Sequence, residues 1–289
     1  MIDNLTFKDK TRQELLTVVP SDKEEIPAFL SAVSRIGGSL EISKKKLSFV
    51  IQVDTYEDGL KIVELFQEIY PSEFELNIET AKSGPRQGKQ ICSIVVPYGF
   101  TKQILFDLCL MKEDGGEIGE FVQGIPAELI VTPEQKVAFL KGLYLACGSV
   151  YVPSVSADEK KEGYHFEFQI DDEVYVDETA GILEDLGIQM KKSERGESFL
   201  LYLKDKDSVQ KMLILLGLSD SAIELQSIID ERETANNLNR AIICETANLD
   251  KTYAACAKQL QAIGEISEKM GLDELPPQLQ EVVDARLEN

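Results

Sequence analysis

The chain contains one segment twice. Residues 138–150 read AFLKGLYLACGSV, and a degenerate copy, AFLSAVSRIGGSL, occupies residues 28–40. Each copy predicts a short helix that ends at glycine and leads into a strand. Small residues recur on one face of each predicted helix: Ala28, Ser31 and Ala32 in the first copy, and Ala138, Gly142 and Ala146 in the second. Because small residues let two helix backbones approach closely, the duplication predicts two related units that meet through these helices.

Both helices are expected to begin with a capping box and to end at a glycine. Thr132 and Gln135 form a capping box in the second copy, and Ser21 and Glu24 offer the same box in the first. A glycine closes each copy, and a left-handed residue commonly ends a helix there. We therefore expect left-handed conformations at Gly38 and Gly148, the closing glycines.

The pattern that follows each helix is also repeated. Alternating polar and apolar residues predict strands at 40–42, 47–54, 73–79 and 90–96, and again at 150–152, 164–170, 188–191 and 198–203. Helical spacing predicts helices at 55–70, at 172–186 and at 208–216. A further helix is predicted to follow the strand at 90–96 and to end at residue 110. The sequence thus predicts an α+β fold made of two αββαββα repeats.

The pattern changes after residue 218, where strand-like alternation stops. A helical run starts at Ser219, and we expect the asparagine cluster at 236–239 to interrupt or bend it. Apolar spacing predicts a helix from 252 to Gly271, and Pro276 precedes a further one. Two helices joined by a short turn fit the front of a helix-turn-helix, and many other helical hairpins fit equally well.

These residues carry a resemblance to known families. The repeated helix, with its small residues and closing glycine, resembles the LAGLIDADG homing-endonuclease domain, a pseudo-twofold saddle whose sheets lie on DNA. Residues 232–252, RETANNLNRAIICETANLDKT, resemble the signature segment of the WhiA family of bacterial transcription regulators, which joins such a saddle to a helix-turn-helix. The resemblance implies a cytoplasmic, nucleoid-associated bacterial regulator of cell division and, in spore-formers, of sporulation.

The resemblance divides the chain into six segments. They are an N-terminal helical tail (1–20), repeat 1 (21–111), a linker (112–131), repeat 2 (132–218), a helical linker with the signature segment (219–251) and a partial helix-turn-helix module (252–289). The tail is expected to dock on the saddle as an amphipathic helix, rather than to act as a partner-binding arm. The family continues past residue 289 into a further helix and a basic tail, so a protein without that helix is expected to bind DNA weakly.

The resemblance also places two vestigial active-site positions. LAGLIDADG nucleases hold a divalent metal with an acidic residue just before each closing glycine, because Mg²⁺ prefers charged oxygen ligands. Gly37 and Cys147 occupy these positions. Glycine has no side chain and a thiolate is a soft ligand. We expect no metal, no cofactor and no nuclease activity, and we expect Cys147 to be a buried, inert residue of the helix interface. A nuclease with relocated ligands is the enzyme alternative.

Two sets of polar residues are candidates for contact with DNA. The predicted hairpin tip at 81–90 carries Lys82, Arg86 and Lys89 without an acid, and a solvated tip explains them equally well. The signature segment supplies amides and cations suited to phosphates and base edges. They are Asn236, Asn237, Asn239, Arg240, Asn248 and Lys251. The alternative is that they cap helices and fix the angle between the saddle and the helical module.

Charge restricts how this chain can meet a nucleic acid. The net charge is −21 and the isoelectric point is near 4.5, so the field of the whole chain repels phosphates. Binding to double-stranded promoter DNA is therefore expected only through a locally favourable face in the C-terminal module. An interaction module that binds proteins, such as other transcription factors, is the alternative. We expect a monomer with no membrane span.

Overall fold

The computed structural model describes residues 5–43, 46–80, 88, 90–154 and 163–287. The chain forms two compact units, Met1–Ile229 and Asp230–Asn289. In chain order, the elements are α1 (Phe7–Thr17), α2 (Ile26–Gly37), β1 (Gly38–Ser43), β2 (Lys46–Val53), α3 (Tyr56–Ile69), β3 (Glu75–Thr80), β4 (Gln90–Val95), α4 (Tyr98–Asp107), β5 (Met111–Asp114), β6 (Glu117–Phe121), η1 (Ala127–Leu129), α5 (Pro133–Cys147), β7 (Gly148–Tyr151), β8 (His165–Ile170), α6 (Glu173–Asp185), β9 (Lys191–Arg195), β10 (Ser198–Leu203), α7 (Lys206–Leu215), α8 (Ser219–Lys269), η2 (Leu272–Glu274) and α9 (Pro277–Leu287).

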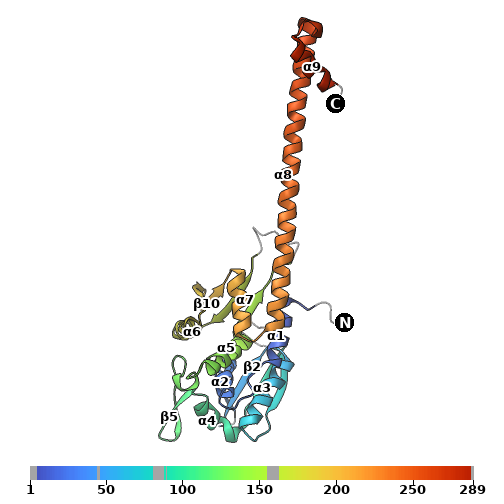
Figure 1. The fold of residues 1–289 in the computed structure, drawn as a ribbon. Helices are drawn as coiled ribbons and strands as arrows, with labels where there is room; N and C mark the ends of the chain where they lie inside the picture. Colours follow the sequence, from blue (N-terminus) through green and yellow to red (C-terminus); the bar gives the residue numbers. More distant parts are fainter. Residues whose placement is uncertain (1–4, 44–45, 81–87, 89, 155–162, 288–289) are drawn as a thin grey trace. The chain divides into compact units, whose positions relative to one another are not determined.

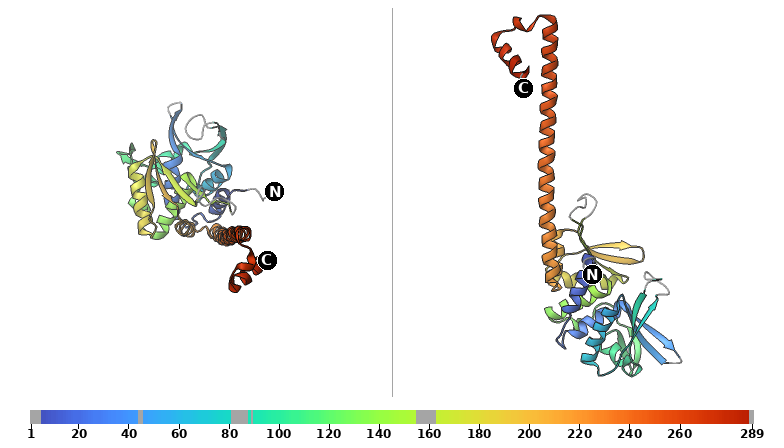
Figure 2. Two further views of the ribbon diagram at one scale, coloured as in Figure 1. Left: turned by 90° about the horizontal axis from the view of Figure 1, so that it is seen from above. Right: turned by 90° about the vertical axis from the view of Figure 1, so that its right-hand side faces the viewer.

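The first unit is built from two copies of one topology. Elements α2 to α4 form one αββαββα repeat and α5 to α7 form the other, with the β5–β6 hairpin between them. Each repeat carries a four-stranded antiparallel sheet, ordered β1-β2-β4-β3 in one and β7-β8-β10-β9 in the other. Figure 1 shows α2 beside α5, and the right-hand view of Figure 2 shows the two sheets one above the other. The predicted α+β duplication is therefore confirmed.

The two central helices pack directly against each other through small residues. A Cβ atom placed on Gly142 of α5 would lie 2.3 Å from the carbonyl oxygen of Phe29 in α2, and 3.1 Å from the Cβ of Ala32. Ala28, Ala138 and the rings of Phe29 and Phe139 are buried around this contact. The prediction that small residues bring two helix backbones together is confirmed.

The ends of these helices are only partly as expected. The capping box of α5 is present: the amide of Gln135 donates to Thr132 Oγ1 at 3.2 Å, and the amide of Thr132 donates to Gln135 Oε1 at 3.1 Å. The box predicted from Ser21 and Glu24 is wrong, because α2 begins at Ile26 with Glu25 as its N-cap and no side-chain cap. Pro27, in the first turn, lacks the amide hydrogen that a cap would satisfy.

The left-handed conformation expected at the closing glycines is also wrong. Gly38 and Gly148 have φ values of −82° and −80° and are extended, because a strand begins at each of them. Glycine is needed there for space. A Cβ on Gly38 would lie 2.1 Å from the Ser34 carbonyl oxygen and 2.6 Å from the Phe49 ring.

The N-terminal tail forms α1, which docks on the first unit as predicted. Leu15 is fully buried, and Thr11 Oγ1 lies 2.9 Å from the buried Tyr144 hydroxyl of α5. A side-chain capping box formed by Thr6 and Asp9 begins the helix. The predicted linker contains β5, β6 and η1, and Lys102 of α4 pairs with Glu117 of β6 at 2.7 Å.

The predicted break at the asparagine cluster is wrong, because α8 runs without interruption from Ser219 to Lys269, as Figure 1 shows. Asparagine in a helix interior costs only a fraction of a kcal/mol relative to alanine, and alanine and leucine surround the cluster. Gly271, at φ +80°, follows the end of α8, and Pro277 opens α9. The predicted pair of helices joined by a short turn is confirmed. Among the described helices, none has a stretch long and apolar enough to cross a membrane.

Candidate functional site

The end of α2 leaves no room for a side chain at Gly37. A Cβ atom built there would lie 2.5 Å from the carbonyl oxygen of Gln52 in β2. That distance is well inside van der Waals contact, and a backbone carbonyl within a sheet cannot rotate away as a side chain does. A carboxylate at position 37 would therefore require β2 to move.

At the end of α5, the thiol of Cys147 donates a hydrogen bond to a carbonyl oxygen of the same helix. Cys147 is half-buried, not buried as predicted, and its Sγ lies 3.4 Å from the Leu143 carbonyl oxygen, four residues earlier. His165 lies on strand β8, as predicted, where Nε2 is 2.7 Å from Glu167 Oε2 and the ring stacks on Tyr202.

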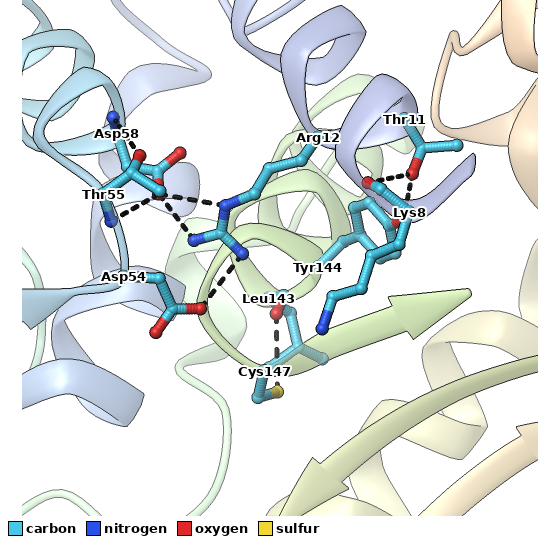
Figure 3. A network of polar contacts seen from close by, with 9 residues as sticks. All are labelled: Lys8, Thr11, Arg12, Asp54, Thr55, Asp58, Leu143, Tyr144 and Cys147. Carbon is cyan, nitrogen blue, oxygen red and sulfur yellow. Dashed lines mark hydrogen bonds and ion pairs between the residues drawn. The ribbon is translucent and has the colours of Figure 1, made fainter. Parts of the chain in front are cut away.

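Carboxylates near the central helices are held by an arginine from α1. Arg12 NH2 and Nε lie 2.7 and 2.9 Å from Asp58 Oδ2, and NH1 lies 3.3 Å from Asp54 Oδ2 (Figure 3). Asp58 is fully buried, and it also accepts from the amide of Thr55 in the capping box of α3. Burial acts to lower the pKa of Arg12, but the hydrogen bonds and charges of Asp58 and Asp54 raise it above its ordinary value. This network ties α1 to α3.

No group of three or more histidine, cysteine, aspartate or glutamate side chains is arranged to hold a metal ion within the described residues. The carboxylates drawn in Figure 3 instead contact the guanidinium of Arg12. The chemistry that this part of the described structure offers is structural ion pairing.

The second unit brings four predicted DNA-contact residues onto one face of α8. With about 100° between successive residues of an α-helix, Asn237, Arg240, Asn248 and Lys251 fall within an arc of about 80°. All four side chains are exposed. Asn239 lies about 140° round the helix from the middle of this arc, and the half-buried Asn236 lies about 40° outside its edge. Because all six residues lie inside the helix, none of them caps a helix end.

The same face continues to a cation that the sequence analysis missed. Lys258 is exposed and falls within the same arc, about two turns beyond Lys251. Glu245 and Asp250 lie about 100° or more away from the middle of it. We call Asn237, Arg240, Asn248, Lys251 and Lys258 the cationic face of α8. Helical spacing would have revealed Lys258 if α8 had been predicted to continue without a break.

The cations of this face are available for a ligand. Among the residues that the structure describes, Arg240, Lys251 and Lys258 take part in no ion pair. The face is therefore a local concentration of positive charge on a chain of net charge −21. Local positive charge of this kind is what attraction to a phosphate backbone requires.

The predicted basic hairpin tip is described only at its base. Lys82, Arg86 and Lys89 lie outside the described residues. The strands on either side pair antiparallel, with Thr80 opposite Gln90, so β3 and β4 form the predicted hairpin. In repeat 2, Arg195 lies opposite Ser198 in the equivalent hairpin.

Two related sheets around a central helix pair, followed by a helical module, define a LAGLIDADG-like protein with an appended helix-turn-helix domain. Three family models match successive parts of the chain: the WhiA N-terminal LAGLIDADG-like domain (23–111), the WhiA LAGLIDADG-like domain (136–235) and the WhiA C-terminal HTH domain (238–289). The chain belongs to the WhiA family.

Individual relatives agree with this assignment. The "Probable cell division protein WhiA" of Staphylococcus haemolyticus (strain JCSC1435) is 30% identical, over 99% of this chain and 86% of the relative. The protein of the same name from Clostridium novyi (strain NT) is 29% identical, over 98% of this chain and 87% of the relative.

Solved structures share the fold. Full-length DUF199/WhiA from Thermatoga maritima superposes with a TM-score of 0.64 at 23% identity, over 99% of this chain and 87% of that one. The N-terminal LAGLIDADG domain of DUF199/WhiA gives a TM-score of 0.51 at 19% identity, over 75% of this chain and 94% of that one.

Proposed function

We propose that this chain is a non-catalytic DNA-binding regulator of transcription that acts in cell division. The observation that carries the proposal is the cationic face of α8, which lies almost entirely within the residues matched by the WhiA HTH domain. The names of the relatives support the cell-division role. Acting on promoter DNA would place the protein at the nucleoid, and a role in sporulation is the corresponding proposal for a spore-forming host.

The DNA-binding proposal is tested by removing charge from this face. Arg240→Gln, Lys251→Gln and Lys258→Gln together should weaken binding to a labelled duplex by at least about tenfold, and reduce the salt slope by up to about 3, since each phosphate contact contributes roughly 0.9. Fluorescence anisotropy across a salt series measures both quantities, and circular dichroism checks that α8 remains helical.

The matched control removes three lysines from the first unit. Lys61→Gln, Lys102→Gln and Lys136→Gln make the same change in net charge at exposed or half-exposed ion pairs. The control should bind DNA as the parent does. Equal loss of affinity in the two triple variants would show a general charge effect and would contradict the proposal.

Lys82, Arg86 and Lys89 are proposed as a secondary contact with DNA. Three cations on a hairpin can contribute a modest phosphate term. The variant with all three changed to glutamine should lose less affinity than the α8 variant. A greater loss would move the main site to the first unit.

The absence of nuclease activity is also a proposal, supported by the two vestigial positions. Gly37 has no space for a carboxylate, Cys147 offers a soft ligand, and Asp54 faces Arg12. Supercoiled plasmid incubated with the purified protein and Mg²⁺ or Mn²⁺ should stay intact. Nicking that EDTA abolishes, and that copurifies with the protein, would reveal an enzyme with relocated ligands.

Exposed apolar residues on α8 favour a second candidate, a protein-interaction module. Leu238, Ile242, Leu249 and Tyr253 lie away from the cationic face and are 51–68% exposed. Apolar groups that repeat along an exposed helix are typical of partner-binding surfaces. Capture of a transcription factor by the nuclease-treated protein, combined with no DNA binding in the anisotropy experiment, would favour this candidate.

A further inference from the structure

A cavity of about 480 Å³ lies between the two repeats of the first unit. One wall comes from the end of α2 and the strands that follow it, and the opposite wall comes from the end of β8 and the start of α6. The chain after β6 closes a third side. The volume is within the range of about 300–1,000 Å³ that is typical of small-molecule sites. The proposed DNA-binding role leaves this cavity unexplained.

Three of the residues that line the cavity each carry a buried polar atom without a hydrogen-bond partner. The residues and atoms are Ser34 (Oγ), Arg35 (Nε) and Tyr175 (the hydroxyl oxygen). Across the described residues, only one further buried side-chain atom, Asp58 Oδ1, shares this condition. Buried polar groups are normally paired, so three unpaired donors on residues that line one cavity favour a ligand that supplies the acceptors.

The positive charge of Arg35, which lines the cavity, is not neutralised by an ion pair in the described part of the chain. Arg35 NH1 donates to the Val122 carbonyl oxygen at 2.5 Å, and NH2 lies 3.4 Å from that of Cys109. The guanidinium also lies 5.5 Å from the centre of the Tyr175 ring. These partners are uncharged, so the cation keeps the capacity to bind an anion.

The hydroxyl of Tyr175 remains a donor near neutral pH. Tyr175 is 2% exposed, and burial raises the pKa of its phenol well above the ordinary value, although the charge of Arg35 acts in the opposite direction. The protonated phenol and the guanidinium over its ring are both hydrogen-bond donors, so both can serve an oxygen acceptor.

Two aspartates also line the cavity and limit the charge of the ligand. Asp172 Oδ1 accepts from the amide of Tyr175 at 2.8 Å as the N-cap of α6, where the helix dipole offsets its charge. Asp171 is exposed. A multiply charged anion such as a phosphate ester would be repelled by both, whereas a single negative charge beside Arg35 is tolerated.

Ser39, Gln123 and Gln169 add neutral polar groups to the lining. Its apolar side chains are Ile36, Leu40, Phe49, Leu105, Leu110, Phe121, Val122 and Ile170. We propose that the cavity binds a small monocarboxylic acid with an apolar body, whose carboxylate accepts hydrogen bonds from Ser34, Arg35 and Tyr175 while its body packs against these side chains.

The experiment compares phenylacetate and hexanoate with phenylacetamide, the uncharged analogue of the first, by calorimetry on the full chain without DNA. At least one of the two acids should bind, and phenylacetamide should bind at least about tenfold more weakly than phenylacetate if phenylacetate is the ligand. Failure of both acids to bind at about 10 mM, or equal binding of phenylacetate and phenylacetamide, overturns the proposal. Because DNA takes no part, the result is independent of the proposed function.

Two tyrosine variants separate the ligand site from a purely structural role. Tyr175→Phe removes one unpaired hydroxyl and should leave the melting temperature equal or higher, while it weakens binding of the acid severalfold. Tyr144→Phe removes a buried hydroxyl that lies 2.9 Å from Thr11 Oγ1, so it should lower the melting temperature and leave binding unchanged. Unchanged affinity in Tyr175→Phe, or equal loss in both variants, contradicts the assignment.

Discussion

At the scale of single residues, Gly37, which we propose as a vestigial metal-ligand position, has no room for a side chain. Replacing it with aspartate should not confer cleavage, because the new Cβ would lie 2.5 Å from the Gln52 carbonyl oxygen. We expect Gly37→Asp to destabilise the first unit by about 1–3 kcal/mol or more, as other overpacking changes do. Urea denaturation measures the free energy of unfolding.

The control for this prediction is Gly163→Asp. Gly163 is exposed, and a Cβ atom added to it would have no other atom within 4 Å, so the same change should cost less than about 0.5 kcal/mol. If Gly37→Asp proved as stable as Gly163→Asp, β2 would have to be free to move, and the steric explanation would fail.

A second prediction at the residue scale concerns the buried ion pair of Arg12. Replacing Arg12 with methionine leaves the carboxylate of Asp58 buried without its cation, which typically costs about 3–5 kcal/mol. The double variant Arg12→Met, Asp58→Asn should recover a large part of that loss, because no uncompensated charge remains. Denaturation curves of the two variants provide the comparison. No recovery in the double variant would show that Arg12 acts through packing.

At the scale of elements, two glycines, one inside helix α6 and one just after it, should respond in opposite directions to replacement by alanine. Gly181 lies inside α6, is exposed, and has open space at its Cβ position, so Gly181→Ala should stabilise by about 0.5–1 kcal/mol. Gly187 follows α6 at φ +81°, a conformation that alanine adopts poorly, so Gly187→Ala should destabilise by a similar amount or more.

Thermal unfolding of the two variants tests this prediction, with the parent protein as the reference. Both substitutions add one methyl group to an open site, so packing and solvation differ little between them. A change of the same sign in the two variants would mean that backbone conformation does not decide the effect.

The elements also show what the sequence could and could not predict. The repeat around Gly142 and the periodic strands that follow each copy predict both αββαββα units. This is possible because duplication and periodicity are properties of the sequence itself. The extended conformation of Gly38 depends on Phe49 and Ser34, which only the folded structure brings together.

The helical region shows a different limit. The asparagine cluster at 236–239 predicts a break in α8, because asparagine is common at caps and turns. Its small helix penalty is outweighed by the good helix formers around it, so the helix continues. That error hides the alignment of Lys258 with Arg240. The cavity at Tyr175 is lined by segments of both repeats that are far apart in the sequence, so no local sequence pattern predicts it.

At the scale of the whole molecule, the net charge of −21 should make stability depend on salt. Like charges repel across the folded surface, and salt screens that repulsion. Raising NaCl from about 10 to about 150 mM should raise the melting temperature by several degrees, while it weakens binding to DNA. Calorimetry in NaCl and in KCl, which screen equally, provides the measurement and its control. A falling melting temperature would show that local ion pairs outweigh the overall repulsion.

During synthesis, the docking of helix α1 is delayed until its partner residues in α5 have been made. Thr11 leaves the ribosome 133 residues before Tyr144, its partner in α5. At about 5–20 residues per second, the wait lasts roughly 7–27 seconds. Throughout it, α1 has only part of its binding surface available, and Leu15 stays accessible to chaperones. Helix α1 is therefore made well before the surface that buries it is complete.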